Sequence, residues 1–137
     1  MHQPPLVVVD AANVVGSVPD GWWRDRRGAA TRLRDAIAGL AASGISDVGV
    51  PEWARRPPVD VVLVVEGAAR GVAAIDDVRV VDAPGSGDDA IVELAEREGV
   101  GRHCLVVTAD RALRVRVQAV GAQTCGPSVL GYRGKAR

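Results

Sequence analysis

Short, mostly apolar runs recur along the chain, and segments with helical spacing separate them. The runs are rich in β-branched valine and have the length of strands rather than helices. They lie at 6–9, 59–65, 78–81, 104–107 and 122–125. Strands that are apolar throughout and alternate with helices are typical of a parallel sheet covered on both faces. We therefore expect an α/β fold, a three-layer sandwich around a four- or five-stranded, mainly parallel sheet.

The helices of this fold are expected at 22–43, 86–98 and 111–120. The first carries apolar residues every three or four positions from Ala29 to Leu40, which is the spacing of one buried helix face. Glycine, serine and proline predict loops at 11–21 and 49–58. The whole chain, 1–137, is expected to be a single domain with a flexible tail at 130–137.

Charge and composition exclude several classes of protein. The chain has 17 Lys and Arg against 17 Asp and Glu, so it lacks the strongly basic surface of many duplex-DNA binders. No apolar run approaches the roughly 20 residues that span a bilayer, and the first five residues do not form a signal peptide. Cys104 and Cys125 lie in strand-like runs, where buried thiols are expected rather than a disulfide or a metal motif. We expect a cytoplasmic protein without membrane association.

Acidic residues follow three of the predicted strands. Asp10, Glu66 and Asp110 stand at strand ends, and Asp88 and Asp89 begin a predicted helix. Ligands of open parallel sheets bind at the carboxyl ends of the strands, so these acids fall where such a fold does its chemistry. Carboxylates that are held together repel one another, and a hard cation such as Mg²⁺ or Mn²⁺ relieves that repulsion. Such a site can hydrolyse a phosphodiester.

Each acid also has a local structural explanation. Asp10 is suited to cap a turn, Asp110 is suited to cap the helix that follows it, and Glu66 could simply be solvated. The Ser86–Asp89 segment has the pattern of a capping box. Neighbours on a helix diverge by about 100°, so only one of Asp88 and Asp89 can point at a given metal. The convergence of the acids on one sheet edge favours a site.

Three segments resemble the NYN domains of the PIN-like nuclease superfamily. They are VVVDAANVV at 7–15, DDAIV at 88–92 and VVTADR at 106–111, and they occur in the order of that family. The resemblance implies a PIN-like fold, a Mg²⁺ or Mn²⁺ cofactor and endoribonuclease activity on RNA. The loop at 16–23 is not a general feature of the family.

The resemblance also implies roles for individual residues. The catalytic residues would be Asp10, Asp88, Asp89 and Asp110, of which Asp10, Asp88 and Asp110 would bind the metal and Asp89 would be an outer ligand or general base. Substrate contacts would come from Asn13, Thr108 and Arg111. Glu66 has no counterpart in the family pattern.

Aromatic and basic side chains suggest how RNA could be held. One indole of Trp22 and Trp23 is expected to pack under the first helix, and the other is suited to stack on an unpaired base. Arg24, Arg26 and Arg27 follow them and could bind phosphates. His103 precedes a strand at the opposite edge of the sheet, which argues against a catalytic role.

Two other functions are compatible with the same residues. The same acids could hydrolyse a nucleotide or another small phosphoester, and the fold could also serve as a non-catalytic nucleic-acid-binding or partner-binding module. A phosphoacceptor receiver domain would need a lysine at a late strand end, and the only lysine is Lys135. RNA is the expected partner, while a homodimer and an unidentified protein partner are left open.

Overall fold

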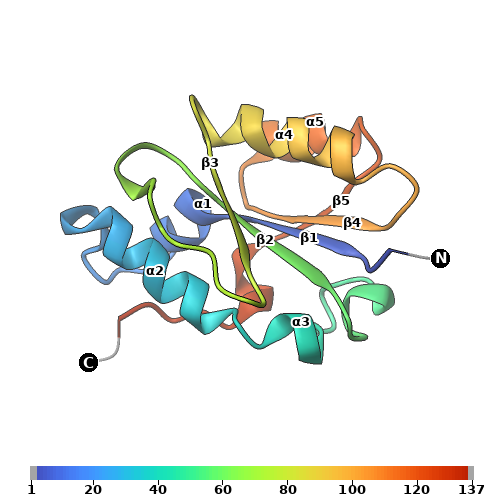
Figure 1. The fold of residues 1–137 in the computed structure, drawn as a ribbon, viewed down its shortest axis with the longest axis horizontal. Helices are drawn as coiled ribbons and strands as arrows, with labels where there is room; N and C mark the ends of the chain where they lie inside the picture. The colour runs from blue at the N-terminus through green and yellow to red at the C-terminus, as the bar shows by residue number, and fades with distance from the viewer. Residues whose placement is uncertain (1–2, 136–137) are drawn as a thin grey trace.

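A computed structural model describes residues 3–135 of the chain, and it contains one sheet of five strands (Figure 1). All neighbouring strands are parallel, and their order is β3-β2-β1-β4-β5. The strands are β1 (Leu6–Asp10), β2 (Asp60–Val65), β3 (Arg79–Asp82), β4 (Cys104–Val107) and β5 (Gln123–Cys125). The predicted α/β architecture is confirmed, and β1, which carries Asp10, lies at the centre of the sheet.

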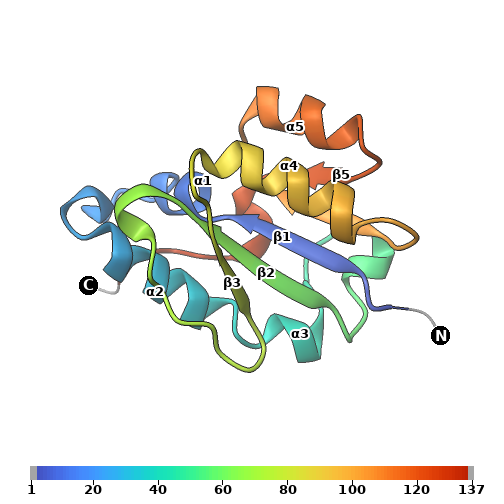
Figure 2. The ribbon, with the colours of Figure 1, turned by 45° about the horizontal axis from the view of Figure 1, so that its top comes forward.

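Helices cover both faces of this sheet, as Figures 1 and 2 show. One layer contains α1 (Ala11–Gly16), α2 (Arg26–Ala36) and α3 (Leu40–Ser43), and the other contains α4 (Gly87–Glu98) and α5 (Arg111–Gln118). Side chains of a strand alternate between the two layers. In β1, Val7 and Val9 belong to the apolar core on the α2 side, whereas Leu6 and Val8 belong to the core under α4 and α5. The three-layer sandwich is therefore a sheet buried on both faces.

The prediction of a loop at 11–21 was wrong in its first half. Helix α1 begins directly after β1, because the Asp10 side chain accepts a hydrogen bond from the backbone N–H of Asn13. Capping of this kind satisfies one of the free N–H groups at a helix start. Val14 and Val15 of α1 are buried in the core on the α2 side of the sheet. The glycine and proline residues that follow them indicated a loop and hid this helix in the sequence.

The helix predicted at 22–43 is interrupted in the structure. A short 3-10 helix at Trp22–Arg24 comes first, and α2 then starts at Arg26 with the Asp25 side chain accepting from the Gly28 N–H. The chain leaves helical geometry at Ile37, whose side chain is buried in the core, and resumes it in α3. Gly44 ends α3 with a φ of 73°, where a Cβ would clash with the Arg55 carbonyl. Burial of Ile37 in the core therefore outweighs the spacing of apolar residues that predicted one continuous helix.

The predicted tail contacts the body of the protein up to residue 135. Pro127–Leu130 forms a 3-10 helix, and Tyr132 packs against the α2-side core. The Lys135 N–H donates a 2.9 Å hydrogen bond to the Asp20 carboxylate. Residues 136–137, the end of that tail, lie outside the described residues. Cys104 and Cys125 are both buried and unbridged, in agreement with their predicted role as small core residues.

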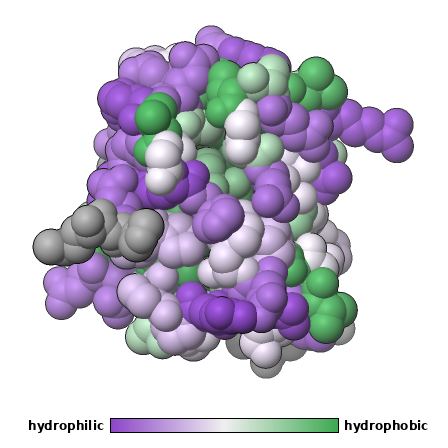
Figure 3. Space-filling view, turned by 90° about the vertical axis from the view of Figure 1, so that its right-hand side faces the viewer, coloured by the Kyte–Doolittle hydropathy of each residue, from purple (hydrophilic) through white to green (hydrophobic). Residues whose placement is uncertain are grey.

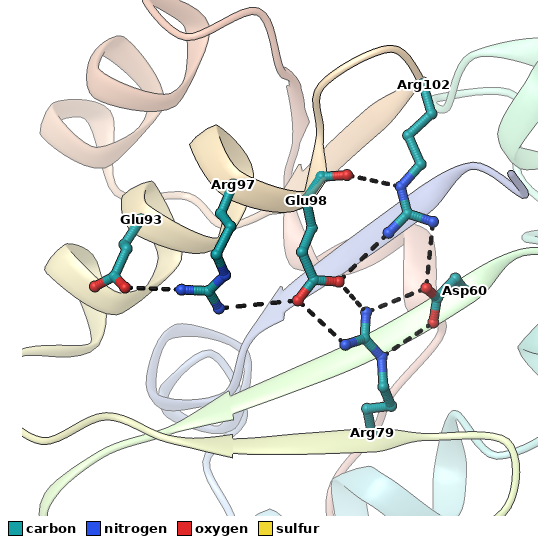
Figure 4. Close-up of polar contacts among 6 residues, drawn as sticks. All are labelled: Asp60, Arg79, Glu93, Arg97, Glu98 and Arg102. Carbon is teal, nitrogen blue, oxygen red and sulfur yellow. Dashed lines mark hydrogen bonds and ion pairs between the residues drawn. The ribbon is translucent and has the colours of Figure 1, made fainter.

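Ion pairs connect neighbouring elements at the edge of the sheet where the strands begin (Figure 4). Arg79, the first residue of β3, pairs with Asp60 at 3.1 Å and with Glu98 at 2.7 Å. Arg102 contacts the same two carboxylates and keeps only 6% of its side chain exposed. The predicted position of His103 at this edge agrees with its location just before β4, where it stacks on Trp53.

The outer surface at this end of the molecule is mostly hydrophilic. Figure 3 shows hydrophobic residues there as separate spots rather than as one continuous patch. Between residues 3 and 135, no helix has the length and apolar character that crossing a bilayer requires.

Candidate active site

The carboxylate of Asp10 is buried at the end of the central strand. Asp10 is 5% exposed and Thr108 is fully buried, and they are the two buried polar residues of the described chain. The Thr108 hydroxyl donates a 2.9 Å hydrogen bond to Asp10 Oδ2, and the Asn13 N–H approaches Oδ1 at 3.4 Å. A carboxylate has about four lone-pair positions, so these two bonds leave capacity for a further partner.

Asn13 and Thr108 join the end of β1 to the end of β4. The Asn13 side-chain oxygen accepts a 2.8 Å hydrogen bond from the Ala109 N–H, and the Thr108 hydroxyl accepts one from the Asp110 N–H at 3.1 Å. Asp110 in turn caps α5, because its Oδ1 accepts from the Leu113 N–H at 3.0 Å. Two of the three segments that resemble the NYN pattern therefore meet through side-chain hydrogen bonds.

Glu66 brings the start of α4 to the same edge of the sheet. It follows β2, and its Oε2 accepts a 2.9 Å hydrogen bond from the Gly87 N–H. A Cβ on Gly87 would lie 2.8 Å from Glu66 Oε1, so a larger residue would disturb this contact. Asp88 comes next in α4. Sequence reasoning counted Glu66 among the acids at this edge but assigned it no part in the site, because its partner Gly87 lies beside it only in the fold.

Burial and neighbouring negative charges raise the pKa of two of these acids. Burial raises the pKa of Asp10 to about 6, with smaller contributions from the charges of Asp88 and Glu66, against the lowering effect of the Thr108 and Asn13 hydrogen bonds. Burial also raises the pKa of Asp88, followed by the charges of Asp110 and Glu66. We call Asp10, Glu66, Asp88 and Asp110 the acidic cluster. Asp88 is its hub, because it interacts with the other three.

In the described part of the chain no arginine forms an ion pair with the acidic cluster, although the charge of Arg116 lowers the pKa of Asp88. Among residues 3–135, none of its four carboxylates makes an ion pair, whereas Asp60 and Glu98 at the opposite edge are both paired with arginine. Uncompensated negative charge around a buried carboxylate attracts a cation.

Asp89 and Arg111 lie apart from these contacts. Asp89 pairs with Arg116 of α5 at 2.9 Å, and this hydrogen bond lowers the pKa of Asp89. The Ser86 hydroxyl accepts from the Asp89 N–H, as the capping-box pattern predicts. Arg111 is exposed at the first position of α5. Of the two neighbouring aspartates, Asp88 interacts with the acidic cluster and Asp89 with a basic partner on the next helix.

The donor set matches a hard divalent cation in kind but does not form a closed metal cage. Carboxylate oxygens are the ligands that Mg²⁺ and Mn²⁺ favour. In the described part of the chain, no three Asp, Glu, His or Cys side chains are grouped so that they could hold one ion, and Asp110 is turned toward its own helix. Mg²⁺ usually keeps several waters and takes one or two protein carboxylates, a number that Asp10 and Asp88 can supply.

A cavity of about 300 Å³ opens beside the acidic cluster. Its walls include Ala11, Val15 and Ala30, and its polar groups are Trp22, Arg26 and Glu66. Trp22 packs against the α2-side core as predicted for one of the two indoles, whereas Trp23 is 55% exposed. Sequence reasoning missed this cavity, because its walls come from segments that only the fold brings together.

Comparisons with known proteins support the fold. No protein-family model matches the chain, and no curated protein matches it in sequence. Two crystal structures of Rae1 (YacP) from Bacillus subtilis are similar to it. One superimposes with a TM-score of 0.68 and 18% identity over 91% of this chain and 70% of that one. The W164L mutant gives a TM-score of 0.61 and 16% identity over 92% and 72%. At this identity the likeness shows the α/β fold alone.

Proposed function

We propose that this protein is a metal-dependent endoribonuclease that hydrolyses RNA phosphodiester bonds at the acidic cluster. The observation that carries the proposal is a buried aspartate at the carboxyl end of the central parallel strand, whose pKa is raised by burial and by the charges of Asp88 and Glu66. The resemblance of the three segments to NYN domains and the PIN-like fold support the same reading.

The cation would be held by Asp10 and Asp88, with Asp110 as a further ligand or a ligand to its waters. The chemistry that a divalent cation supplies at such a site is charge neutralisation on a phosphate and a lower pKa for a water molecule. Either Mg²⁺ or Mn²⁺ suits oxygen ligands of this kind.

The protein's own side chains would orient the reaction. Thr108 and Asn13 hold the Asp10 carboxylate in one position by the hydrogen bonds described above. Glu66 lies at the same edge of the sheet and would not hold the cation, so it would be placed to accept the proton of the attacking water. The exposed guanidinium of Arg111 is suited to bind a substrate phosphate.

Cleavage of a single-stranded RNA tests the proposal. Wild type is compared with Asp10→Asn, Asp88→Asn and Asp110→Asn in Mg²⁺, Mn²⁺ or EDTA, and Asp76→Asn, at an exposed turn, is the matched control. We expect cleavage only with a divalent cation. Asp10→Asn and Asp88→Asn should lower the rate by at least about 100-fold, since loss of an outer-shell partner alone costs 10–100-fold. Cleavage that persists in EDTA and in both variants would overturn the proposal.

The cavity beside the acidic cluster favours one other candidate, a hydrolase of nucleotides or other small phosphoesters. A mononucleotide would fit beside Glu66 and place its phosphate near Asp10. Release of inorganic phosphate from nucleoside phosphates, with no cleavage of RNA, would select this candidate. RNA binding without either reaction would indicate a non-catalytic module.

A further inference from the structure

We infer that the cavity between α1, α2 and the 3-10 helix at Gly67–Ala69 is a subsite for one unpaired nucleobase, next to the phosphodiester that is cleaved. The inference rests on the proposed function and adds to it the class of substrate, which is RNA with a single-stranded segment at the cleavage point.

The walls of the cavity suit a flat aromatic group. Ala11, Val15 and Ala30 are buried and present small apolar surfaces, which leaves space that larger side chains would fill. The Trp22 indole forms another wall, and the Arg26 guanidinium lies over its ring at 5.2 Å from the centroid. Aromatic rings and arginine planes are the groups on which proteins stack unpaired bases.

The polar groups of the cavity also match a base. Arg26 offers hydrogen-bond donors and Glu66 offers acceptors. The edge of a nucleobase carries both kinds of group, whereas a purely apolar ligand would leave them unpaired. A base inside an A-form duplex is stacked and cannot enter such a cavity, so the subsite selects a single strand.

The position of the cavity ties it to the acidic cluster. Ala11 lines the cavity and directly follows Asp10. Glu66 lines it as well, and its charge contributes to the raised pKa values of both Asp10 and Asp88. A base held in the cavity would therefore have its own phosphate at the acidic cluster.

Nuclear magnetic resonance of the tryptophan indoles tests base binding directly. The protein has three tryptophans, and the indole N–H signal of Trp22 is assigned by its loss in Trp22→Phe. The four nucleoside 5′-monophosphates are titrated in EDTA, with ribose 5-phosphate as the probe without a base. We expect the Trp22 signal to shift with the nucleotides and to stay in place with ribose 5-phosphate.

Two pairs of matched variants locate the effect. Ala69→Leu narrows the cavity and should abolish the shift, whereas Ala68→Leu, on the exposed side of the same 3-10 helix, should retain it. Trp22→Ala should raise KM for single-stranded RNA about tenfold with little change in kcat, because loss of one stacking partner weakens binding. Trp53→Ala, whose side chain stacks on His103 outside the cavity, should leave KM unchanged.

The results separate this inference from the proposed function. A nucleotide-dependent Trp22 shift that Ala69→Leu abolishes supports the subsite even if the protein fails to cleave RNA. A Trp22 signal that ignores the nucleotides in folded wild type overturns the inference even if cleavage is efficient. Equal shifts with ribose 5-phosphate would also overturn it, since they would show phosphate binding without a base.

Discussion

The Thr108 hydroxyl donates a 2.9 Å hydrogen bond to Asp10 across 98 residues of sequence, and both side chains are buried. The same hydroxyl accepts from the Asp110 N–H, so a single oxygen joins the ends of β1 and β4 to the start of α5. It is the strongest side-chain influence that lowers the pKa of Asp10. Thr108 therefore controls both the position and the charge of the buried acid of the cluster.

Replacement of Thr108 by valine removes that hydroxyl while keeping the shape of the side chain. We expect Thr108→Val to lower the free energy of unfolding by about 1–3 kcal/mol, since a buried acceptor loses its partner. The pKa of Asp10 should rise further. Urea unfolding measures the loss of stability. The carboxyl carbon chemical shift of Asp10, followed as a function of pH, measures its pKa. Thr108→Ser keeps the hydroxyl and should restore the pKa of Asp10. A pKa of Asp10 that is unchanged in Thr108→Val would contradict the assigned role.

Asp10→Asn should stabilise the fold at pH 7.5 and have little effect at pH 3.5. The pKa of Asp10 is about 6 in the folded protein against an ordinary value of 3.8. Between these values the folded state binds a proton that the unfolded chain has released, so the stability linked to Asp10 is complete below pH 3.8 and is lost as the pH rises through 6. The gain at pH 7.5 should be on the order of 2–3 kcal/mol.

Urea unfolding of wild type and Asp10→Asn in EDTA at the two pH values gives this difference. The acids outside the acidic cluster titrate equally in both proteins and cancel. An equal difference in stability at pH 3.5 and pH 7.5 would show that Asp10 is not a buried acid with a raised pKa.

The ion pairs at the other edge of the sheet should contribute to the free energy of unfolding in proportion to their burial. Arg102, with 6% of its side chain exposed, contacts Asp60 and Glu98, and its loss should cost about 3 kcal/mol because two carboxylates lose a desolvated partner. Arg97 is 60% exposed and pairs with Glu93 and Glu98. Its loss should cost less than about 0.5 kcal/mol. Urea unfolding of Arg102→Met beside Arg97→Met tests the difference, and equal losses would disprove it.

Asp88 and Asp89 should differ in their effects on RNA cleavage. Asp88 interacts with the acidic cluster, whereas Asp89 pairs with Arg116 on α5. We expect Asp88→Asn to abolish cleavage and Asp89→Asn to keep at least about a third of the rate, since an exposed ion pair contributes little. Rates at saturating Mg²⁺ measure both variants. A larger loss in Asp89→Asn would assign the outer-ligand or base role to Asp89.

The fold and part of the site follow from local patterns in the sequence. The apolar runs predict the parallel sheet, and the spacing of Asp10 and Asn13 reflects one helical turn that starts at the strand end. The same spacing was a signal for α1, but the glycine and proline residues further along led to the prediction of a loop. Ser86 caps α4 as its pattern indicates.

The remaining features depend on contacts between distant segments. Glu66 acquires its place because Gly87 lies beside it, and Arg116 acquires its partner Asp89 because α4 and α5 pack together. The break in the first long helix depends on where Ile37 is buried. Periodicity carries no information about such contacts, so the cavity beside the acidic cluster could be found only in the fold.

Paramagnetic broadening by Mn²⁺ tests most directly whether the acidic cluster binds a cation. We predict that substoichiometric Mn²⁺ broadens the backbone amide signals of Ala11, Gly67, Asp88 and Ala109 first, and that Asp10→Asn combined with Asp88→Asn removes this selectivity. Broadening centred on exposed acids such as Asp76 and Asp77, or spread evenly over the surface, would contradict the account.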